Sequence, residues 1–241
     1  MATGIETPSA LQSGTRGDSS IARMLQGFIF MAAWMVLLFA CAGTAGYVRG
    51  WICSVTYFVA MTAIGWIVHR RNPGLFPARA HWRHADTKPF DKIILPLFFF
   101  LTILLPTFAG LDVRFHRPSF PFRTVYPALV LSLCAMSLIG WTMVTNPWAE
   151  SSVRIQTDRG QQVVGSGPYR FVRHPLYLGC MVLYSASAVI FGGFDALLVA
   201  LILDGLIVLR TELEDRTLQR ELSGYQQYAG ITRWRLLPGI W

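Results

Sequence analysis

Two arginines, a histidine and two tyrosines are concentrated between Gly167 and Gly179, directly before a long apolar segment. Gly167 and Pro168 favour a rigid turn, and the glycine lets backbone N–H groups approach a ligand. The planar guanidinium of Arg173 suits a carboxylate, and the imidazole of His174 can donate or accept a hydrogen bond near neutral pH. These residue types indicate a site that holds a charged ligand beside an apolar one.

The helix that follows is expected to begin within this stretch. Pro175 suits the first position of a helix, so the positive end of the helix dipole would face the site. Tyr177 adds an aromatic edge in the first turn, and Gly179 leaves space beside it. The alternative is that these polar and aromatic residues only anchor a span at the membrane interface.

A second polar group follows further along the chain. Arg210 and Glu214 are four positions apart, so they share one face of a helix. If the last two apolar segments form a helical hairpin, Glu214 returns to the level of His174. A carboxylate and two arginines would then converge and could hold a zwitterion, with arginine on its carboxylate and glutamate on its ammonium. The alternative is a solvated, charged helix face leaving the membrane.

The composition of the chain predicts that these groups are positioned by membrane helices. Hydrophobic residues make up 53% of the 241 and charged residues only 14%, which is too apolar for a typical soluble domain. A membrane-spanning helix needs about 20 mostly apolar residues. Five segments without a charged side chain approach or exceed that length: Met24–Val48, Trp51–Val68, Ile93–Leu111, Thr124–Ala149 and Pro175–Phe194. A shorter sixth segment, Ala196–Leu209, contains Asp204.

The sequence therefore predicts an all-α integral membrane protein with a bundle of five to six transmembrane helices. With six spans and a cytoplasmic N-terminus, 17 of the 21 lysines and arginines fall on the cytoplasmic side, as the positive-inside rule requires. We thus expect both termini and the site to be cytoplasmic. The net charge of +8 then reflects topology and attraction to anionic lipids. The sequence has no compact basic domain of the kind that would indicate a nucleic-acid partner.

The chain is expected to form one membrane domain over residues 24–241, with a catalytic core at about 125–241. Residues 1–23 are rich in serine, threonine and glycine, which is typical of a disordered tail. The four cysteines lie within predicted spans without metal-type spacing and are expected to be buried free thiols. His81 and His84 share a helical spacing, but the nearby arginines would repel a cation, so we expect no metal site.

Two segments near the predicted site have their own local pattern. Asp91 and Lys92 stand at the start of a span and are interpreted as snorkelling interfacial anchors. Residues 150–174 form one long connection, within which Val153–Gln156 alternates like a short strand before a turn at Asp158–Gly160. We expect a hairpin that lies back over the mouth of the bundle, because connections of this length are more often functional than incidental.

The motif over residues 167–179 resembles the GPYxxVRHPxYxG signature of the isoprenylcysteine carboxyl methyltransferase family. Members are integral membrane enzymes related to phospholipid N-methyltransferases. Other parts of the chain are similar to segments of the family that surround this signature: Asn146, Val153–Gln156, Arg159–Gly160, Arg210–Glu214, Gly224–Tyr228 and Arg235–Gly239. The resemblance covers roughly Thr87 to Trp241.

The resemblance implies S-adenosylmethionine as the cofactor, in a cofactor site made of loops and helices; the chain has no GxGxxG turn of the Rossmann type. It implies that Arg173, Arg210 and Glu214 are the catalytic residues. The implied cofactor-binding residues are Gly167, Pro168, Tyr169, His174, Pro175, Tyr177 and Glu214. Where the family often has paired glutamates, this chain has Glu214-Asp215, so the second acid is expected to reach less far.

The reaction implied is direct displacement of the sulfonium methyl by a nucleophile that arrives from the membrane. Such a transfer depends on alignment and on exclusion of water more than on acid–base catalysis. Arg173 or Arg210 would position a carboxylate acceptor, whereas Glu214 would accept the proton of an amine or thiol; the sequence leaves these alternatives open. A phospholipid amine or a small thiol is thus an alternative acceptor.

Two other classes of function remain as alternatives. One is a sterol-reductase-like membrane enzyme that uses NADPH, although such proteins are usually longer. The other is a membrane transporter, which would favour an internal repeat of spans, and the sequence shows none. Asp204 is either a functional group within the membrane or a residue near the outer turn of the hairpin.

Overall fold

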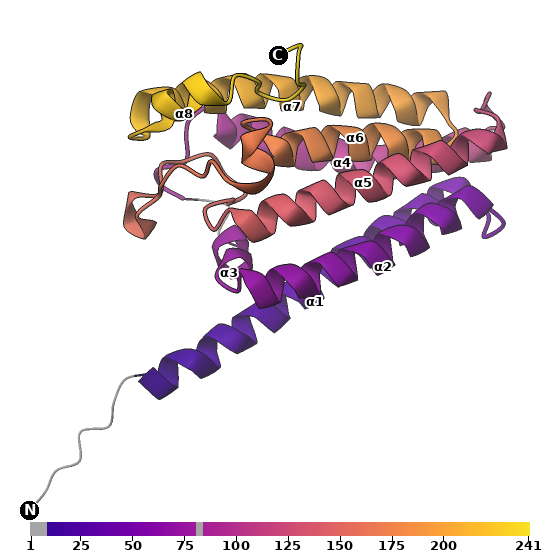
Figure 1. Cartoon of the computed structure of the whole chain (residues 1–241). Coiled ribbons are helices and arrows are strands. Elements are labelled where there is room, and N and C mark those ends of the chain that lie inside the picture. The colour runs from indigo at the N-terminus through magenta and orange to yellow at the C-terminus, as the bar shows by residue number, and fades with distance from the viewer. Residues whose placement is uncertain (1–8, 81–83) are drawn as a thin grey trace, which may run out of the picture.

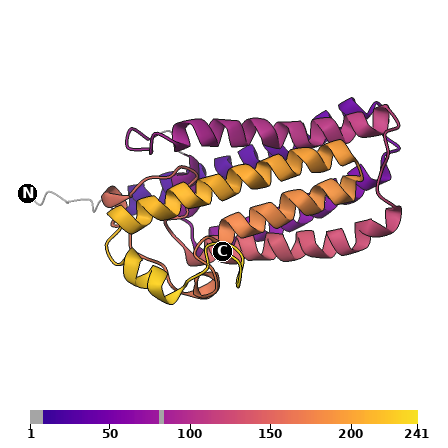
Figure 2. The ribbon, with the colours of Figure 1, turned by 90° about the horizontal axis from the view of Figure 1, so that it is seen from above.

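The computed structural model describes residues 9–80 and 84–241. Six long helices run back and forth along a common axis (Figures 1 and 2). They are α1 (Ser9–Ala42), α2 (Val48–Arg71), α4 (Asp91–Arg114), α5 (Val125–Thr145), α6 (Pro175–Phe191) and α7 (Phe194–Glu221). The shorter elements are α3 (Leu75–Ala80), α8 (Tyr225–Ile231) and the 3₁₀ turns η1 (Phe122–Thr124), η2 (Thr157–Arg159) and η3 (Gly167–Arg170). No β-strand occurs in the described residues, so the predicted all-α fold is confirmed.

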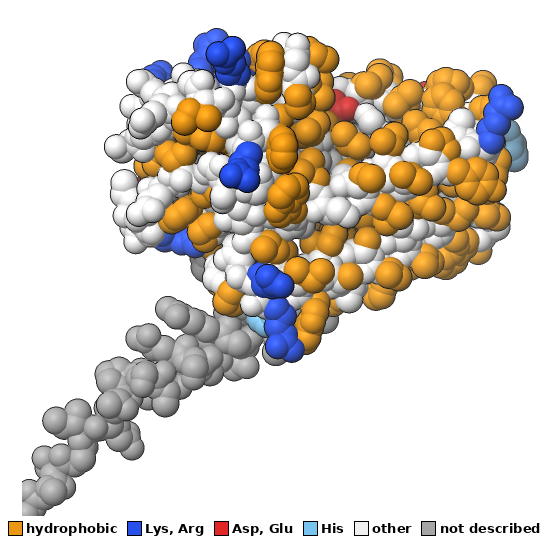
Figure 3. Space-filling view, in the orientation of Figure 1, with side chains coloured by type: hydrophobic (Ala, Val, Ile, Leu, Met, Phe, Trp, Pro, Cys, Tyr) orange, Lys and Arg blue, Asp and Glu red, His pale blue; other side chains and the backbone are white. Residues whose placement is uncertain are grey.

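The bundle has the length and the surface of a membrane protein. Within the described residues, three helical stretches are long and apolar enough to cross a membrane: Val48–Arg71, Asp91–Arg114 and Phe122–Thr145. Two shorter apolar helices cover Gln26–Ala42 and Pro175–Phe191. Large apolar side chains are exposed along the bundle, and Figure 3 shows them spread over much of its side. Lipid is the environment in which such exposure has no cost, since it is as apolar as these side chains.

The six long helices pack as a closed ring, in the order α1, α4, α7, α6, α5, α2 and back to α1. Glycines allow two of these contacts to be close. A Cβ at Gly179 of α6 would lie 2.6 Å from Cγ1 of Ile139 on α5, and one at Gly110 of α4 would lie 2.5 Å from the carbonyl oxygen of Leu38 on α1. Small residues at such crossings bring helix backbones together where no hydrophobic effect drives association.

Because successive long helices run antiparallel, the α2–α4 connection, the α5–α6 connection, the start of α1 and the C-terminus lie at one end of the bundle. The segment carrying α3, the loop between α5 and α6, and the C-terminal segment with α8 all lie at that end (Figure 1). The opposite end holds the tight α6–α7 turn, where Gly192 has φ +95°. The predicted helical hairpin of the last two apolar segments is therefore present, since α6 ends at Phe191 and α7 begins at Phe194.

The strand predicted at Val153–Gln156 is wrong. These residues are extended but pair with no neighbouring strand. The N–H of Val153 donates to Oδ2 of Asp91 at 2.7 Å, and its carbonyl accepts from the N–H of Lys88 at 3.0 Å. Because the start of α4 takes both backbone groups, the loop is held against that helix and not against a second strand.

The N-terminal segment also differs from the expectation. Residues 9–23, which were predicted to belong to a disordered tail, form the first turns of α1. Residues 1–8 and His81 lie outside the described residues, so the structure says nothing of the tail before Ser9 or of that histidine.

Candidate functional site

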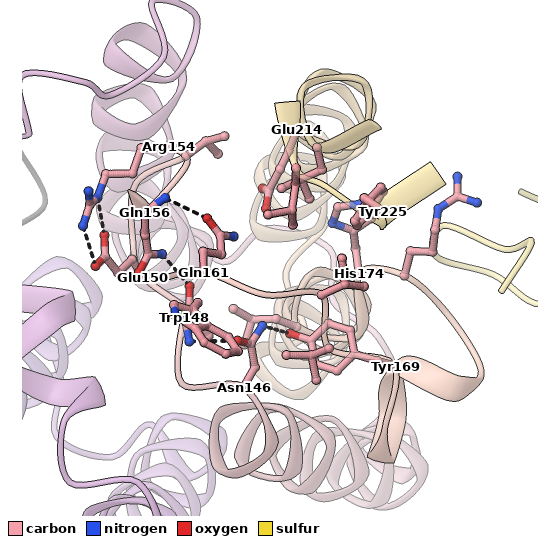
Figure 4. Close-up of a pocket in the computed structure, with 18 of the residues that line it drawn as sticks. Asn146, Trp148, Glu150, Arg154, Gln156, Gln161, Tyr169, His174, Glu214 and Tyr225 are labelled. Atoms are coloured by element: carbon pink, nitrogen blue, oxygen red, sulfur yellow. Dashed lines mark hydrogen bonds and ion pairs between the residues drawn. The ribbon is translucent and has the colours of Figure 1, made fainter. Parts of the chain in front are cut away.

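A polar pocket lies at the loop-bearing end of the bundle, between the α5–α6 loop, the start of α6, the charged half of α7, and α8 (Figure 4). It encloses about 830 Å³ of empty space, counting its open mouth. Its aromatic and amide side chains are Trp148, Tyr169, Tyr177, Tyr225, Tyr228, Asn146, Gln156, Gln161 and Gln162. Its charged and imidazole side chains are Glu150, Arg154, Arg173, His174, Arg210 and Glu214.

The signature motif divides into residues that line this pocket and residues that shape it. Tyr169, His174 and Tyr177 line the pocket together with Glu214, so the predicted convergence across the hairpin is confirmed. Gly167, Pro168 and Pro175 lie outside the lining. Pro168 is buried in η3, and Pro175 is the first residue of α6, as the sequence predicted.

Gly167 fixes η3 against the end of α5. It has φ +57°, and a Cβ there would lie 2.9 Å from Oγ1 of Thr145 and 3.1 Å from Nε1 of Trp141. Only glycine fits both the backbone conformation and the space. From this turn the hydroxyl of Tyr169 accepts a hydrogen bond from Nδ2 of Asn146 at 2.7 Å. The turn therefore fixes the lower wall of the pocket (Figure 4).

Arg173 is held by a buried acid and by backbone carbonyls. Its Nε and Nη2 each lie 2.8 Å from the two oxygens of Asp215, and its Nη1 donates to the carbonyls of Thr232 and Arg233. This bidentate geometry is the strongest that an arginine and a carboxylate can form. Since the protein occupies these donors, Arg173 supports the site from behind and has little left to offer an acceptor.

Asp215 also organises four other side chains. Tyr225 and Arg235 donate to it at 2.9 Å each, Gln219 at 2.7 Å, and Nε2 of His174 lies 3.3 Å away. Burial alone would raise the pKa of Asp215, but the hydrogen bonds from His174 and Arg173 hold it well below its usual range. Asp215 was expected to reach less far than the second glutamate of the family pattern. It is instead the fully buried centre of a network that fixes His174 and α8.

Arg210 has an equivalent partner in Asp91. Nε of Arg210 lies 2.8 Å from Oδ1 of Asp91 and Nη2 lies 3.0 Å from Oδ2; Nη2 also donates to the carbonyl of Ser151 at 2.6 Å. Asp91 is fully buried, so its interpretation as a snorkelling anchor is wrong, although Lys92 is exposed. An acid in the first turn of α4 is favoured there by the helix dipole and by the arginine together.

Glu214 is the pocket acid that remains without a basic partner. The hydroxyl of Tyr177 donates to Oε2 of Glu214, and no described lysine or arginine forms an ion pair with this carboxylate. The ring of Tyr177 stacks on that of His174, with centroids 5.7 Å apart, and Cζ of Arg210 lies 5.5 Å from its centroid. A carboxylate in this setting is available to a cationic group of a ligand.

The opposite wall is a cluster of charges that folds the loop on itself. Arg154 donates to Glu150 at 2.8 and 3.1 Å and to Asp158 at 2.7 Å, and Arg159 donates to Glu150 at 3.0 Å. Hydrogen bonds from Glu150 and Asp158 raise the pKa of Arg154 above its usual range despite the opposing effect of burial. The resemblance to the family pointed to Arg154 and Arg159, but no pattern in the sequence identified Glu150 as the acid that both of them bind.

Several lining residues were not predicted individually. Trp148, Gln161, Tyr225 and Tyr228 carry no spacing that marks them, and they reach the pocket only because the loop and α8 fold over it. Burial raises the pKa of Tyr228 to about 12, so its hydroxyl stays protonated and donates to the carbonyl of Tyr169 at 2.7 Å. A hint existed in the closing segment, where Gly224–Tyr228 resembles the family pattern.

Asp204 lies on α7 between the hairpin turn and the pocket, and its side chain is not part of the pocket lining. The hydroxyl of Ser185 on α6 donates to its Oδ2 at 2.6 Å, so the two polar groups join the arms of the hairpin. Among the described residues no set of three or more histidines, cysteines or acids is placed to hold a metal ion. The four cysteines are free thiols, as predicted, but only Cys53 is buried; Cys41 and Cys180 are partly exposed and Cys134 is exposed.

The comparison with known protein families gives a match that overlaps this site. Residues 128–220 match the model of the isoprenylcysteine carboxyl methyltransferase (ICMT) family. Over these residues the chain is similar to the ICMT family. The matched part runs from α5 through the loop, the signature and the hairpin to the acid pair on α7, so it contains most of the residues that line the pocket. The ICMT match does not extend to α1–α4 or α8, and no curated protein matches the chain.

Proposed function

We propose that this protein transfers the methyl group of S-adenosylmethionine to a lipophilic acceptor of the isoprenylcysteine type, which reaches the pocket from the bilayer. The observation that carries the proposal is the convergence of His174, Tyr177 and the unpaired acid Glu214 on one pocket at the mouth of an apolar bundle, within the residues that match the family. Such a pocket brings a polar cofactor and a membrane-soluble substrate together.

The pocket residues fit the chemistry of this cofactor. Glu214 has no basic partner among the described residues, so its carboxylate suits the ammonium of the methionine part. Trp148, Tyr225 and Tyr228 offer aromatic faces, and Asn146 and Gln161 offer amides for the adenosine part. When bound, the cofactor would supply an electrophilic methyl group on a sulfonium.

The chain's own residues would then act by holding and enclosing the reactants. The Asp215 network keeps His174 and α8 in place, and the Asp91–Arg210 pair ties the loop at Ser151 and Val153 to α4 and α7. Because these contacts are formed within the protein, the enclosure is preorganised and excludes water without further cost at the moment of reaction. An acceptor carboxylate needs no base, whereas an amine would require Glu214 to accept a proton.

The distribution of basic residues supports a cytoplasmic orientation of the site. In the described residues Arg49, Arg114, Arg117 and Arg123 lie at the end opposite the pocket, and the other 16 lysines and arginines belong to the segments of the pocket end. By the positive-inside rule, the pocket and both termini then face the cytoplasm. The partners proposed are the lipophilic substrate and the surrounding membrane lipids, and the catalytic core is proposed to be about 125–241.

Binding of S-adenosylmethionine to the detergent-purified protein, compared with NADPH, tests the proposal. We expect saturable binding of S-adenosylmethionine, methyl transfer from it to an N-acetyl-S-prenylcysteine, and no binding of NADPH. Affinity for NADPH alone would favour a reductase, and affinity for neither would leave a transporter. Both outcomes contradict the proposal.

A pair of variants on α7 tests the role of Glu214. Glu214→Gln should weaken binding of S-adenosylmethionine about 10- to 100-fold, since a charge-assisted hydrogen bond is worth about 1.5–3 kcal/mol. Glu212→Gln removes the same charge two residues earlier, where the acid pairs with Arg216 and Arg235. This control should bind the cofactor as the wild type does, and equal losses in the two variants would refute the assignment.

A further inference from the structure

Arg79 lies on α3, outside the family match, and has a different environment from the other arginines around the pocket. Its Nη1 donates to the carbonyl of Ala149 at 2.6 Å and reaches that of Glu150 at 3.5 Å. The guanidinium therefore lies against the backbone of Ala149 and Glu150, two residues that line the pocket.

Four other arginines in or beside the pocket are neutralised by acids. Arg173 pairs with Asp215, Arg210 with Asp91, and both Arg154 and Arg159 with Glu150. Arg79 forms no ion pair with an acid among the described residues, and its guanidinium donates to backbone carbonyls. It is thus a positive charge at the site whose counter-ion is missing.

The surroundings of Arg79 make its positive charge costly to leave without a counter-ion. The side chain is half-buried, and burial lowers the pKa of Arg79, with the nearby positive charge of Arg210 adding to the effect. Tyr177, Tyr169 and Cys180 also lie within electrostatic reach of it. Tyr177 lines the pocket and Cys180 follows one turn later on α6, so Arg79 lies close to the first turns of that helix, next to the pocket lining.

We propose that Arg79 binds the carboxylate of the methyl acceptor and orients it toward the pocket. The inference rests on the proposed function and adds to it the residue that selects an anionic acceptor. A guanidinium with little access to water binds a carboxylate most strongly when two parallel N–H groups donate to it. In Arg79 only Nη1 donates to the loop carbonyls, which leaves Nε and Nη2 for such a carboxylate.

The chemistry of transfer agrees with this role. A carboxylate oxygen forms the new C–O bond as the C–S bond breaks, and the electron pair of that bond goes to sulfur, giving a neutral thioether and a neutral ester. No proton is released, so no base is needed beside Arg79. Because the ester carries no charge, Arg79 holds the product less strongly than the substrate, which favours release into the bilayer.

The test compares two probes on the purified full-length protein: an N-acetyl-S-prenylcysteine with a free carboxylate, and its primary carboxamide as a non-reactive competitor. Wild type should bind the carboxylate more tightly than the amide. Arg79→Gln should raise the acceptor KM at least 10-fold, abolish the preference for carboxylate over amide, and leave the affinity for S-adenosylmethionine within about twofold. Arg71→Gln, which removes an exposed charge at the end of α2, is the matched control for surface potential and should change neither value.

Other outcomes would overturn the inference in distinguishable ways. If Arg79 only fastens the loop at Ala149, Arg79→Gln will weaken cofactor binding and leave the acceptor KM and the preference unchanged. If wild type neither binds S-adenosylmethionine nor methylates the probe, the proposed function itself has failed. If Arg79→Gln does not fold, Arg79→Lys is the second variant, because lysine keeps the charge but lacks the two parallel N–H donors of a guanidinium. It should raise the acceptor KM several-fold, and an unchanged KM contradicts the proposal. A long-chain fatty acid methylated as well as the prenylcysteine would show that the carboxylate alone is recognised.

Discussion

Replacement of Asp215 by asparagine is the perturbation whose size the structure defines best. The substitution keeps the shape of the side chain and removes its charge. Asp215 is fully buried and holds Arg173, which is itself only 7% exposed, through two hydrogen bonds of 2.8 Å. Removing one partner of a buried pair typically costs about 3–5 kcal/mol, because the other charge is left without compensation.

The cost should appear in thermal stability. Asparagine still offers one acceptor oxygen, so we expect a loss near the lower limit, about 3 kcal/mol. For a chain of this size each kcal/mol corresponds to about 2–4 °C, which gives a fall of about 6–12 °C in the melting temperature in detergent. Glu212→Gln is the control, because this more exposed acid on the same helix forms surface pairs worth about 0–1 kcal/mol.

The pH dependence gives the same prediction a second readout. The pKa of Asp215 is lowered in the folded protein, so its contribution to stability is complete above the ordinary aspartate value of about 4 and is lost as the pH falls below it. The difference in melting temperature between wild type and Asp215→Asn should therefore shrink on acidification from about pH 5 to pH 3. A melting temperature no lower than that of Glu212→Gln, or a difference that grows on acidification, would refute the reasoning.

Three further substitutions test other contacts of the site. Asp91→Asn leaves Arg210 without a counter-ion and should lower both the melting temperature and the affinity for S-adenosylmethionine, whereas Lys92→Gln next to it should change neither. Tyr177→Phe removes the hydrogen bond to Glu214 and should lower the rate of methyl transfer by up to about tenfold without a large loss of stability, as measured by radiolabel transfer. Gly179→Leu inserts a side chain into the α5–α6 contact and should destabilise the bundle by more than about 1–3 kcal/mol, the usual cost of overpacking.

The outcomes that contradict these three predictions are equally specific. Equal effects of Asp91→Asn and Lys92→Gln would show that the buried pair has no special weight. Tyr126→Phe, at an exposed tyrosine of α5, should retain full activity, and a similar loss there would point to a general effect of the substitution. Gly205→Leu on α7 has no atom within 4 Å of its Cβ position, so a melting temperature as low as that of Gly179→Leu would disprove the packing argument.

Local patterns were sufficient to predict the helices and the existence of the site. Runs without charge predicted the membrane helices, and Pro175 predicted the start of α6, because both depend on nearby residues alone. The spacing of Arg210 and Glu214 predicted a shared helix face, and the short turn at Phe191–Phe194 predicted the hairpin. The motif over residues 167–179 was sufficient to indicate the family that residues 128–220 match.

Contacts between distant segments could not be predicted in the same way. Val153 has the alternation of a strand, yet its backbone groups bind Asp91 and Lys88, which are more than sixty positions earlier. Asp91 has the sequence context of an interfacial anchor, and only the packing of α4 beside α7 buries it against Arg210. Periodicity contains no information about which helix becomes the neighbour.

What the sequence determined by itself is an apolar helical bundle with a charged motif at the mouth of its last hairpin. The tertiary structure decided which charges are available. Arg173 and Arg210 are neutralised by Asp215 and Asp91, whereas Glu214 in the pocket and Arg79 beside it form no ion pair within the described residues. The reason is physical: a buried charge is stable only beside an opposite one, and the ring of helices determines which pairs form.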